Sequence, residues 1–551
     1  MGYLKSLGTG FVWICTILAA ITFIPGLPPQ IETTPYNVKQ PMALNKERNG
    51  RLNNPEILFD GEIHGPESFD IYDGVLYTGL HGGAVGKIVN NKIIEVVKFG
   101  NKCDGVYEEE KCGRPLGLKF DKNGKLFVVD AYYGIFKVDV KTKKYEKIID
   151  LTKPIDGKIP VLANSIDIAS NGDLYWTVSS SDFKLNDLVY SFLADPSGRL
   201  IRYNAATKKN QVLLENLGFA NGVKLSDDES FVLVAETLSS KIIKYFIKGQ
   251  KAGKSEILID GLPGAPDNIH SDGQGNFFVT FPTLIDEDHP FISQTLAPHS
   301  NLRKMLLRLL GIIEAPFKLF EQVYPNIYTK RIVNYIGHYE SVQGTSEPGA
   351  TVIRFDGNGN ILDILDNNDE KLSLISSAII KDNYLYLGSP VNKFLARVSL
   401  AKALPDFKKV DKIVPTKKPV TTTPKPVTKT TPKPTTTTPK PTTTTTPKPV
   451  TTTTPKPTTT TTPKPTTTTT PKPATTTQKP TQKPAEKVTK PKPTVTPTIK
   501  PVVEKVDEQI KNTVKTPPKP VKNTKQPDIK PVKEETFETK NQQKKPIRDE
   551  M

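Results

Sequence analysis

Between residues 56 and 405 the chain alternates short apolar segments with turns rich in Asp, Asn and Gly. The segments YDGVLYTGL, DKNGKLFVVDA, SNGDLYWTVS and DGQGNFFVTF each place such a turn before a run of Val, Leu, Phe, Tyr or Trp. Asp-Gly and Asn-Gly pairs favour the positive φ angles of tight hairpin turns, and aromatic and β-branched residues are typical of strands. The pattern therefore predicts a series of β-hairpins. None of the turns completes the EF-hand pattern, so we interpret their acids as turn residues.

These hairpins recur with a regular period. A loop residue precedes the first strand of each copy, and the spacing between copies is close to 48 residues, with one of 57. Repeats of roughly 40–50 residues with four strands each are typical of β-propellers. The sequence therefore predicts an all-β fold, a six-bladed β-propeller over residues 56–405. The loop position is occupied by Glu67, Asn164, Asn221, Asn268 and, in another copy, Arg114-Pro115-Leu116.

The amino-terminal segment predicts a membrane helix. Residues 7–27 carry no charge, and this segment is long enough to span a bilayer as a helix. Only a short flank with one Lys precedes it. The run ends in Pro25-Gly26-Leu27, a poor cleavage site, so we favour a type II signal-anchor with residues 1–6 cytoplasmic and the rest lumenal or at the cell surface. A cleaved signal peptide and a secreted protein remain the alternative. Residues 28–55 are expected to be a linker.

Residues 298–324 interrupt the strand pattern. Their spacing of apolar residues is helical and the segment is also basic. Two interpretations stay open: an insertion that packs on the propeller rim, or an amphipathic surface that lies on a membrane or covers a pocket.

The carboxyl-terminal segment, residues 406–551, has a different composition. From Asp411 onward it contains 28 prolines, 29 Lys plus Arg, 11 Asp plus Glu and one aromatic residue, Phe537. Such a segment buries too little apolar surface to fold. Its repeated Thr runs between Pro-Lys-Pro units predict an O-glycosylated mucin-like tail, whose glycans are candidate ligands for lectin or surface-protein partners; an undecorated basic linker is the alternative. Because the rest of the chain is almost neutral, we expect no nucleic-acid partner.

The loop residues also carry the candidate chemistry. In a propeller the loops that open the inner strands converge on the central channel, which would bring together Glu67, Asn164, Asn221, Asp267 and Asn268. These side chains offer oxygen ligands with two carboxylates, the set that Ca²⁺ prefers. Cys103 and Cys112 lie nine residues apart and predict a short-loop disulfide in an oxidising compartment; two unpaired thiols are the alternative. We interpret His270, which follows Asn268, as a turn or surface residue.

Several ordered motifs resemble the strictosidine-synthase-like family: GPES, CGRPLGLKF, LFVVDAYYGIFKVD, FANGV, FVLVAET, PGAPDNI and YLYLGS. The resemblance covers about residues 55–402. It implies a six-bladed propeller related to the paraoxonases and other calcium-dependent lactonases and arylesterases, with a channel calcium held by the five loop residues and a Cys103–Cys112 bridge. In such relatives the calcium polarises an ester or lactone carbonyl.

The sequence also departs from that family. Residues 374–378 lack the Glu that strictosidine synthases use, so condensation of an amine with an aldehyde is not expected. Leu116 and Ala131 stand where paraoxonases have a histidine pair, and Ser68 and Ser165 where a second calcium would need carboxylates. The catalytic residues are therefore unassigned. Two functions remain: a calcium-dependent hydrolase of esters or lactones, or a catalytically decayed propeller that acts as a cell-surface adhesion or ligand-binding mucin.

Overall fold

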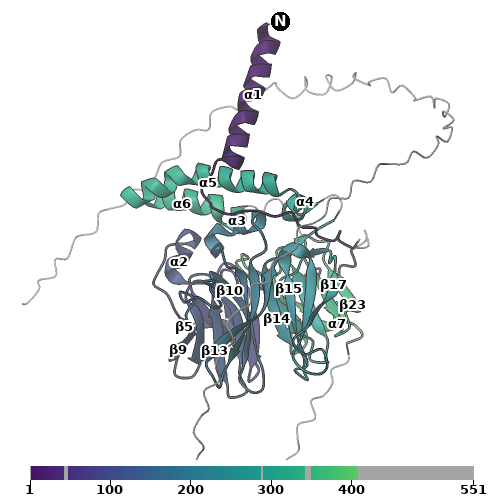
Figure 1. Cartoon of the computed structure of the whole chain (residues 1–551). Helices are drawn as coiled ribbons and strands as arrows, with labels where there is room; N and C mark the ends of the chain where they lie inside the picture. The colour runs from purple at the N-terminus through teal and green to yellow at the C-terminus, as the bar shows by residue number, and fades with distance from the viewer. Residues whose placement is uncertain (1, 43–47, 287–288, 342–348, 408–551) are drawn as a thin grey trace, which may run out of the picture. The chain divides into compact units, whose positions relative to one another are not determined.

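The computed structural model describes residues 2–42, 48–286, 289–341 and 349–407. The predicted tail, residues 406–551, lies outside this part except for its first two residues. Strands dominate the described residues, and they form six four-stranded antiparallel sheets and one two-stranded sheet (Figure 1). Most predicted Asp-Gly and Asn-Gly turns join the first and second strands of a sheet, as at Asp73-Gly74.

The sheets follow one another along the chain. The first contains β2 (Phe69–Tyr72), β3 (Val75–Gly79), β4 (Ala84–Val89) and β5 (Lys92–Lys98). The second contains β6 (Pro115–Phe120), β7 (Lys125–Asp130), β8 (Gly134–Asp139) and β9 (Tyr145–Ile149). The third contains β10 (Leu162–Ile168), β11 (Leu174–Ser180), β12 (Gly198–Asn204) and β13 (Lys209–Leu217).

The fourth sheet contains β14 (Ala220–Leu225), β15 (Phe231–Glu236), β16 (Lys241–Phe246) and β17 (Ser255–Asp260). The fifth contains β19 (Ile269–Ser271), β20 (Phe277–Phe281), β22 (Thr351–Phe355) and β23 (Ile361–Asp366). The sixth contains β24 (Ser377–Lys381), β25 (Tyr384–Gly388), β26 (Leu395–Ser399) and β1 (Glu56–Leu58). The two-stranded sheet pairs β18 (Gly264–Ala265) with β21 (Thr283–Leu284).

The sixth sheet joins the two ends of the strand region. Its outer strand β1 comes from the start of the region and pairs with β26 at the end, with Ile57 opposite Ala396. The first strands of successive sheets lie next to one another, and β24 in turn lies next to β2, which closes a ring. The architecture is consistent with a β-propeller.

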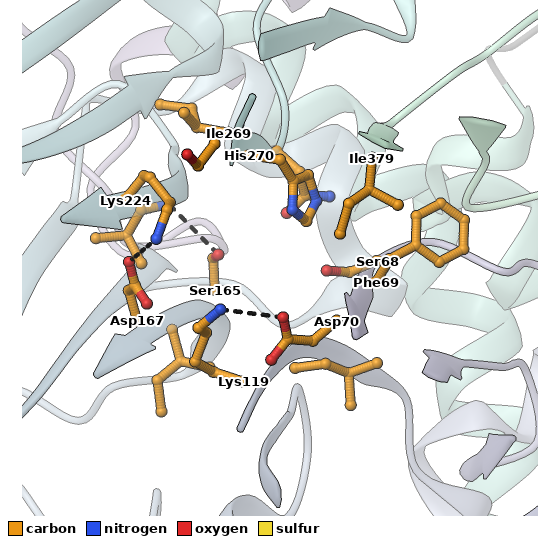
Figure 2. A pocket seen from close by; sticks show the side chains of 15 residues that line it. Ser68, Phe69, Asp70, Lys119, Ser165, Asp167, Lys224, Ile269, His270 and Ile379 are labelled. Carbon is orange, nitrogen blue, oxygen red and sulfur yellow. Dashed lines mark hydrogen bonds and ion pairs between the residues drawn. The ribbon is translucent and has the colours of Figure 1, made fainter. Parts of the chain in front are cut away.

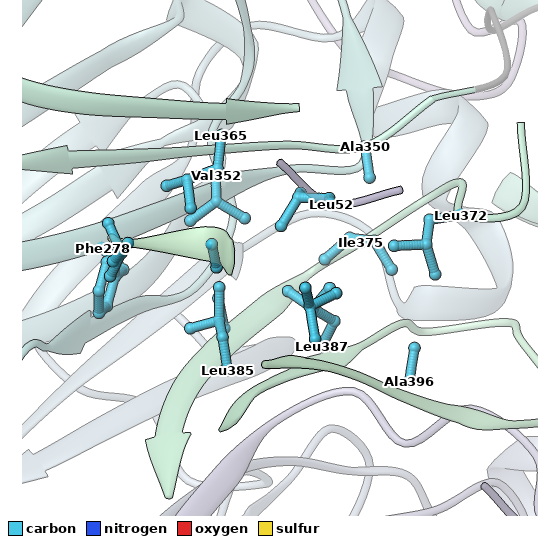
Figure 3. Close-up of a cluster of buried hydrophobic side chains, with 14 of the residues drawn as sticks. Leu52, Phe278, Ala350, Val352, Leu365, Leu372, Ile375, Leu385, Leu387 and Ala396 are labelled. Carbon is cyan, nitrogen blue, oxygen red and sulfur yellow. The ribbon is translucent and has the colours of Figure 1, made fainter. Parts of the chain in front are cut away.

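Apolar side chains fill the space between neighbouring sheets. Each of six buried clusters joins one sheet to the next around the ring, including the sixth to the first. The cluster between the fifth and sixth sheets includes Val352, Leu385 and Leu387, and the supposed linker contributes Leu52, which is fully buried there (Figure 3). Face-to-face packing of this kind is the largest favourable contribution to the stability of a sheet protein.

The helices gather at one end of the sheets. Strands alternate in direction, so the loops before each inner strand and those between the second and third strands share an end. That end carries α2 (Glu109–Cys112), α3 (Leu188–Leu193), α4 (Ile292–Leu296), α5 (Ser300–Val323), α6 (Ile327–Gly337) and three short 3₁₀ turns, η1 (Val106–Glu108), η2 (Leu185–Asp187) and η3 (Thr237–Ser239). α7 (Leu400–Ala403) follows the last strand. Figure 1 shows α5 and α6 side by side over this end.

The predicted helix over residues 298–324 is confirmed as α5, and α4 and α6 were not predicted. A helix also forms at the predicted amino-terminal apolar segment, but its bounds differ from the predicted 7–27. α1 runs over Gly2–Phe23, and the stretch Lys5–Phe23 is long and apolar enough to cross a membrane. The helix ends before Pro25, because proline has no backbone N–H to donate to the preceding turn.

Candidate functional site

The structure places all five predicted ligands at the helix-covered end of the inner strands. Glu67 comes two residues before β2, Asn164 lies in β10, Asn221 lies in β14, and Asp267 and Asn268 directly precede β19. All five side chains are buried, with at most 7% of their surface exposed. The first strands of four different sheets therefore direct these residues to one end of the ring.

Main-chain hydrogen bonds link these strand starts to one another. The amide of Gly222 donates to the carbonyl of Asp267 at 3.2 Å, and the amide of Asn268 donates to the carbonyl of Ser376 at 3.1 Å. The hydroxyl of Ser376 donates to the carbonyl of Glu67 at 2.9 Å. The residues 374–378 that lack the expected carboxylate thus position Glu67 and Asn268 through backbone and hydroxyl contacts.

The two asparagines are held by hydroxyl groups of the neighbouring strands. Nδ2 of Asn164 donates to Ser179 Oγ at 3.0 Å, and Nδ2 of Asn221 donates to Thr237 Oγ1 at 3.4 Å. Both hydroxyls in turn donate to backbone carbonyls at 2.8 Å. Because each amide nitrogen is engaged on one side, the amide oxygen of the same residue points to the other.

Four buried oxygens of this set lack a hydrogen bond from any residue in the described part of the chain. They are Glu67 Oε2, Asn164 Oδ1, Asn221 Oδ1 and Asp267 Oδ1. Nδ2 of Asn268 is also unsatisfied, and turning that amide by 180° would present its oxygen instead. A buried polar atom without a partner costs about 1–3 kcal/mol, so four oxygens of one kind at one place fit a bound cation.

The two carboxyl groups of this set, Glu67 and Asp267, are close enough for the charge of one to change the pKa of the other. Burial is the main cause that raises the pKa of Asp267 well above its ordinary value, and the charge of Glu67 raises it further, while the nearby amide of Asn221 opposes the rise. Burial likewise raises the pKa of Glu67, and the nearby Arg114 guanidinium opposes this. Two buried carboxylates that repel each other favour a cation that would neutralise both.

A second buried network, which the sequence did not predict, adjoins Glu67. Arg114 is 1% exposed, and its guanidinium lies 3.6 Å from Glu67 Oε2 and 3.8 Å from Glu109 Oε1. Glu109 is also contacted by the hydroxyl of Tyr132 at 3.2 Å and by Nδ1 of His81 at 2.9 Å. Burial alone would raise the pKa of Glu109, but nearby His338 and His81 and the charge of Arg114 hold this pKa well below its ordinary value. A chain of alternating charges therefore runs from Glu67 through Arg114 to Glu109.

Three histidines that the sequence did not place here, His64, His81 and His338, lie in this region. His81 contacts Glu109 and also has Nε2 2.9 Å from the carbonyl of Pro390, so both ring nitrogens face oxygen acceptors. His64 stacks on His81 with 4.1 Å between ring centroids, and His338 Nε2 lies 3.9 Å from Glu109. Stacked imidazoles direct their lone pairs into separate planes, so we interpret His64 and His81 as a packing pair and not as joint metal ligands.

The disulfide between Cys103 and Cys112 is present, with 5.5 Å between the two Cα atoms. It closes the loop that carries Glu109 and ends two residues before Arg114. The predicted pairing is thus confirmed, and it supports the second network. A signal for that network was available in the sequence EEEKCGRP, because an Arg directly before an apolar strand needs a buried carboxylate if it faces inward.

A cavity of about 120 Å³ lies between the inner strands (Figure 2). Most of its lining residues follow the candidate ligands along the chain, and Asn268 itself and residues of β6 and β24 complete it. Lys119 pairs with Asp70 at 3.0 Å, and Lys224 pairs with Asp167. His270 lies in β19 and lines this cavity with Nε2 2.7 Å from Ser377 Oγ, so its interpretation as a turn or surface residue was wrong. Burial and then the two lysines lower the pKa of His270 to about 3, so its ring is neutral at pH 7.

The charges of the cavity balance without an added ion. Two ammonium groups face two carboxylates, and Ser68 and Ser165 line the same cavity without charge. Leu116 and Ala131, which stand at the paraoxonase histidine positions, are buried in an apolar cluster and carry no titratable group.

Comparison with known proteins identifies the chain's relatives. Models of the families described as strictosidine synthase and strictosidine synthase-like, N-terminal, match residues 164–250 and 47–88. Adipocyte plasma membrane-associated protein Hemomucin of Drosophila melanogaster is 41% identical over 73% of this chain and 71% of its own length. The adipocyte plasma membrane-associated protein of Rattus norvegicus is 32% identical over 68% of this chain and 94% of its own length.

Solved structures with a similar arrangement include a gluconolactonase from Xanthomonas campestris, 12% identical with a TM-score of 0.39 over 68% of this chain and 99% of that one. A calcium-binding regucalcin from Agrobacterium tumefaciens is 11% identical with a TM-score of 0.37 over 62% of this chain and 92% of that one. The sequence relatives decide the assignment: the chain belongs to the strictosidine synthase-like family and is homologous to the adipocyte plasma membrane-associated proteins and to Drosophila hemomucin.

Proposed function

We propose that the six sheets form a six-bladed propeller whose channel binds Ca²⁺ and hydrolyses esters or lactones. The observation that carries this proposal is the set of four buried oxygens, contributed by four sheets, that accept no hydrogen bond from the described residues. Glu67, Asn164, Asn221, Asp267 and Asn268 would hold the ion. Carboxylate and amide oxygens without nitrogen or sulfur ligands suit Ca²⁺.

When bound, the ion would act as a Lewis acid toward the carbonyl oxygen of the substrate. The chain's own residues prepare this site. Glu67 and Asp267 supply negative charge, and the hydroxyls of Ser179 and Thr237 orient the amides. Arg114 places a fixed positive charge beside Glu67. Glu109 would neutralise that charge when the Glu67 carboxylate binds the ion.

The alternative is a surface mucin whose propeller binds ligands or partners, including lectins, without catalysis. It is favoured by the apolar surroundings of Leu116 and Ala131, which place no proton acceptor where paraoxonases have histidines. For both functions we propose that α1 is an uncleaved type II anchor, which puts the propeller outside the cell and the O-glycosylated tail with it.

Turnover of phenyl acetate by the full-length protein separates these functions. We expect hydrolysis in calcium, loss of hydrolysis after chelation, and recovery when calcium is restored. Asp70→Asn, which changes a buried carboxylate outside the ligand set, serves as the control and should retain calcium-dependent turnover. Equal rates in calcium and in chelator, or no hydrolysis at all, would contradict the hydrolase and favour the mucin.

The stabilisation by calcium should depend on pH. Glu67 and Asp267 have pKa values raised by burial in the calcium-free protein, so their neutral forms stabilise the fold at low pH. That contribution is lost as the pH rises from the ordinary pKa values, 4.5 for Glu67 and 3.8 for Asp267, through the raised ones. Calcium binding, in contrast, needs both groups ionised. The difference in melting temperature between calcium and chelator should therefore widen from pH 5 to pH 8. A difference that narrows over this range in matched buffers would contradict these ligands.

A further inference from the structure

The carboxyl-terminal half of α5 and the exposed side of α6 present an apolar surface that the hydrolase does not use. Six large hydrophobic side chains are more than half exposed there: Leu319, Phe320, Val323, Tyr324, Tyr328 and Tyr335, with Val323 at 86%. We call these six residues the apolar face. Across the described residues from 48 to 407, the only other large hydrophobic side chains above half exposure are Ile257 and Ile292. Such a concentration marks an interaction site.

The opposite side of α5 is fixed to the sheets by buried polar contacts. Arg303 is fully buried and donates to the carbonyls of Leu193 and Ala194 at 3.1 and 3.0 Å. Tyr190 donates to Glu314 at 2.7 Å. These anchors hold α5 against α3, so the apolar face cannot turn inward to bury itself.

Arg308 connects α5 to the end of the apolar helix α1. Its guanidinium donates to the carbonyls of Ile21, Thr22 and Ile24 at 3.1, 2.8 and 2.9 Å. Ile21 and Thr22 belong to the last turn of α1 and Ile24 directly follows it. Carbonyls at a helix end have no N–H donor further along the helix, so the guanidinium supplies one. α5 therefore meets α1 where its apolar span ends, which is the level of a membrane surface if α1 crosses the bilayer.

The charges beside the apolar face are already engaged. Lys318 pairs with Glu314 at 2.8 Å and Lys330 with Glu108 at 2.8 Å. Arg331 lies over the ring of Tyr107 at 5.1 Å. The face thus offers aromatic and aliphatic groups, a chemistry typical of the interfacial layer of a membrane. Of the three cations beside it, two are ion-paired and Arg331 is held over an aromatic ring.

We infer that the apolar face rests in the surface layer of the same bilayer that α1 enters, as a second membrane contact. This inference rests on the anchor proposed above. It also turns the end of the sheets that carries the five candidate ligands toward the membrane, because α5 and α6 cover that end, and His338 directly after α6 reaches Glu109. Apolar substrates dissolved in lipid would then meet the site without crossing water.

The test uses the full-length protein in phosphatidylcholine nanodiscs with an environment-sensitive fluorophore on single cysteines. The native Cys15 in α1 is exposed and unpaired, so a label on it reports the anchor. Val323→Cys and Tyr328→Cys, each in a Cys15→Ser background, report the apolar face. Ile257→Cys is the matched control, an exposed apolar residue on β17 away from these helices.

We expect nitroxide-labelled lipid to quench most of the fluorescence at positions 15, 323 and 328, and aqueous iodide to quench position 257. Because Lys318 and Lys330 are ion-paired and Arg331 lies over the ring of Tyr107, adding phosphatidylserine should leave this pattern unchanged. Quenching by iodide at 323 and 328 with lipid quenching at 15 would overturn the docking while the anchor stands. Iodide quenching at 15 would instead overturn the anchor. Lipid quenching at 323 and 328 in discs that hold one copy of the protein supports the inference. If these positions are protected from iodide only in discs that hold two copies, the apolar face instead contacts a second copy of the chain.

Discussion

Glu67→Gln is expected to remove most of the difference between the melting temperatures in calcium and in chelator. Glu67 and Asp267 are the two carboxylates of the proposed ligand set, so the substitution halves its formal negative charge while the side-chain shape is kept. A ligand at roughly a hundredfold excess over its Kd stabilises the folded state by about 2.7 kcal/mol, and this is the stabilisation at stake. Thermal unfolding of the full-length variant with and without calcium measures it.

Asp70→Asn is the matched control for this change. Asp70 lies in β2, three residues after Glu67, and it is equally buried but accepts from the amide of Phe120 at 2.6 Å and pairs with Lys119 at 3.0 Å. Its loss should lower both melting temperatures and leave their difference intact. If Glu67→Gln keeps the full difference, or Asp70→Asn removes it, the assignment of Glu67 as a ligand is wrong.

Glu109→Gln should lower the free energy of unfolding by about 3–5 kcal/mol, because it leaves the Arg114 guanidinium buried without its main counter-charge. Glu109 is 2% exposed and also orders His81 and Tyr132. With Glu109 neutralised, Arg114 should interact more strongly with Glu67, which already lies 3.6 Å away, so calcium affinity should fall as well. Urea unfolding in chelator measures the first effect, and calcium titration measures the second.

The adjacent residue provides the control. Glu110 follows Glu109 in the same helix, but its carboxylate pairs with Lys184 at the surface, where both side chains are about half exposed. Exposed ion pairs contribute little because water and salt screen them, so Glu110→Gln should leave the unfolding midpoint almost unchanged. Equal effects of the two substitutions would show that the buried network does not stabilise the loop.

The sequence was most informative where local chemistry decides the structure. Asp-Gly and Asn-Gly turns predicted the hairpins, and the recurring polar position predicted Glu67, Asn164 and Asn221 at one end of the sheets. Of these three, only Glu67 precedes its strand as a loop residue; Asn164 and Asn221 lie within β10 and β14. The pairing of Cys103 with Cys112 could also be predicted, because the two cysteines are only nine positions apart in the sequence. In each case, residues close together in the sequence determine most of the local structure.

Features that depend on distant segments were missed. β1 pairs with β26 across almost the whole strand region, and a three-residue strand carries no signal for such a partner. The network around Glu109 combines His81 from the first sheet, Arg114 from the second and His338 from the end of α6. No spacing along the chain relates these residues, and only the closed ring of sheets brings them together.

Calorimetric titration of Ca²⁺ into the chelator-treated full-length protein tests the central claim most directly. The ligand set predicts one ion per chain, with protons released because the carboxyl groups have raised pKa values before the ion binds. Glu67→Gln should weaken this binding strongly, and Asp70→Asn should not. The absence of binding at millimolar calcium, or binding that Glu67→Gln leaves unchanged, would contradict the calcium site.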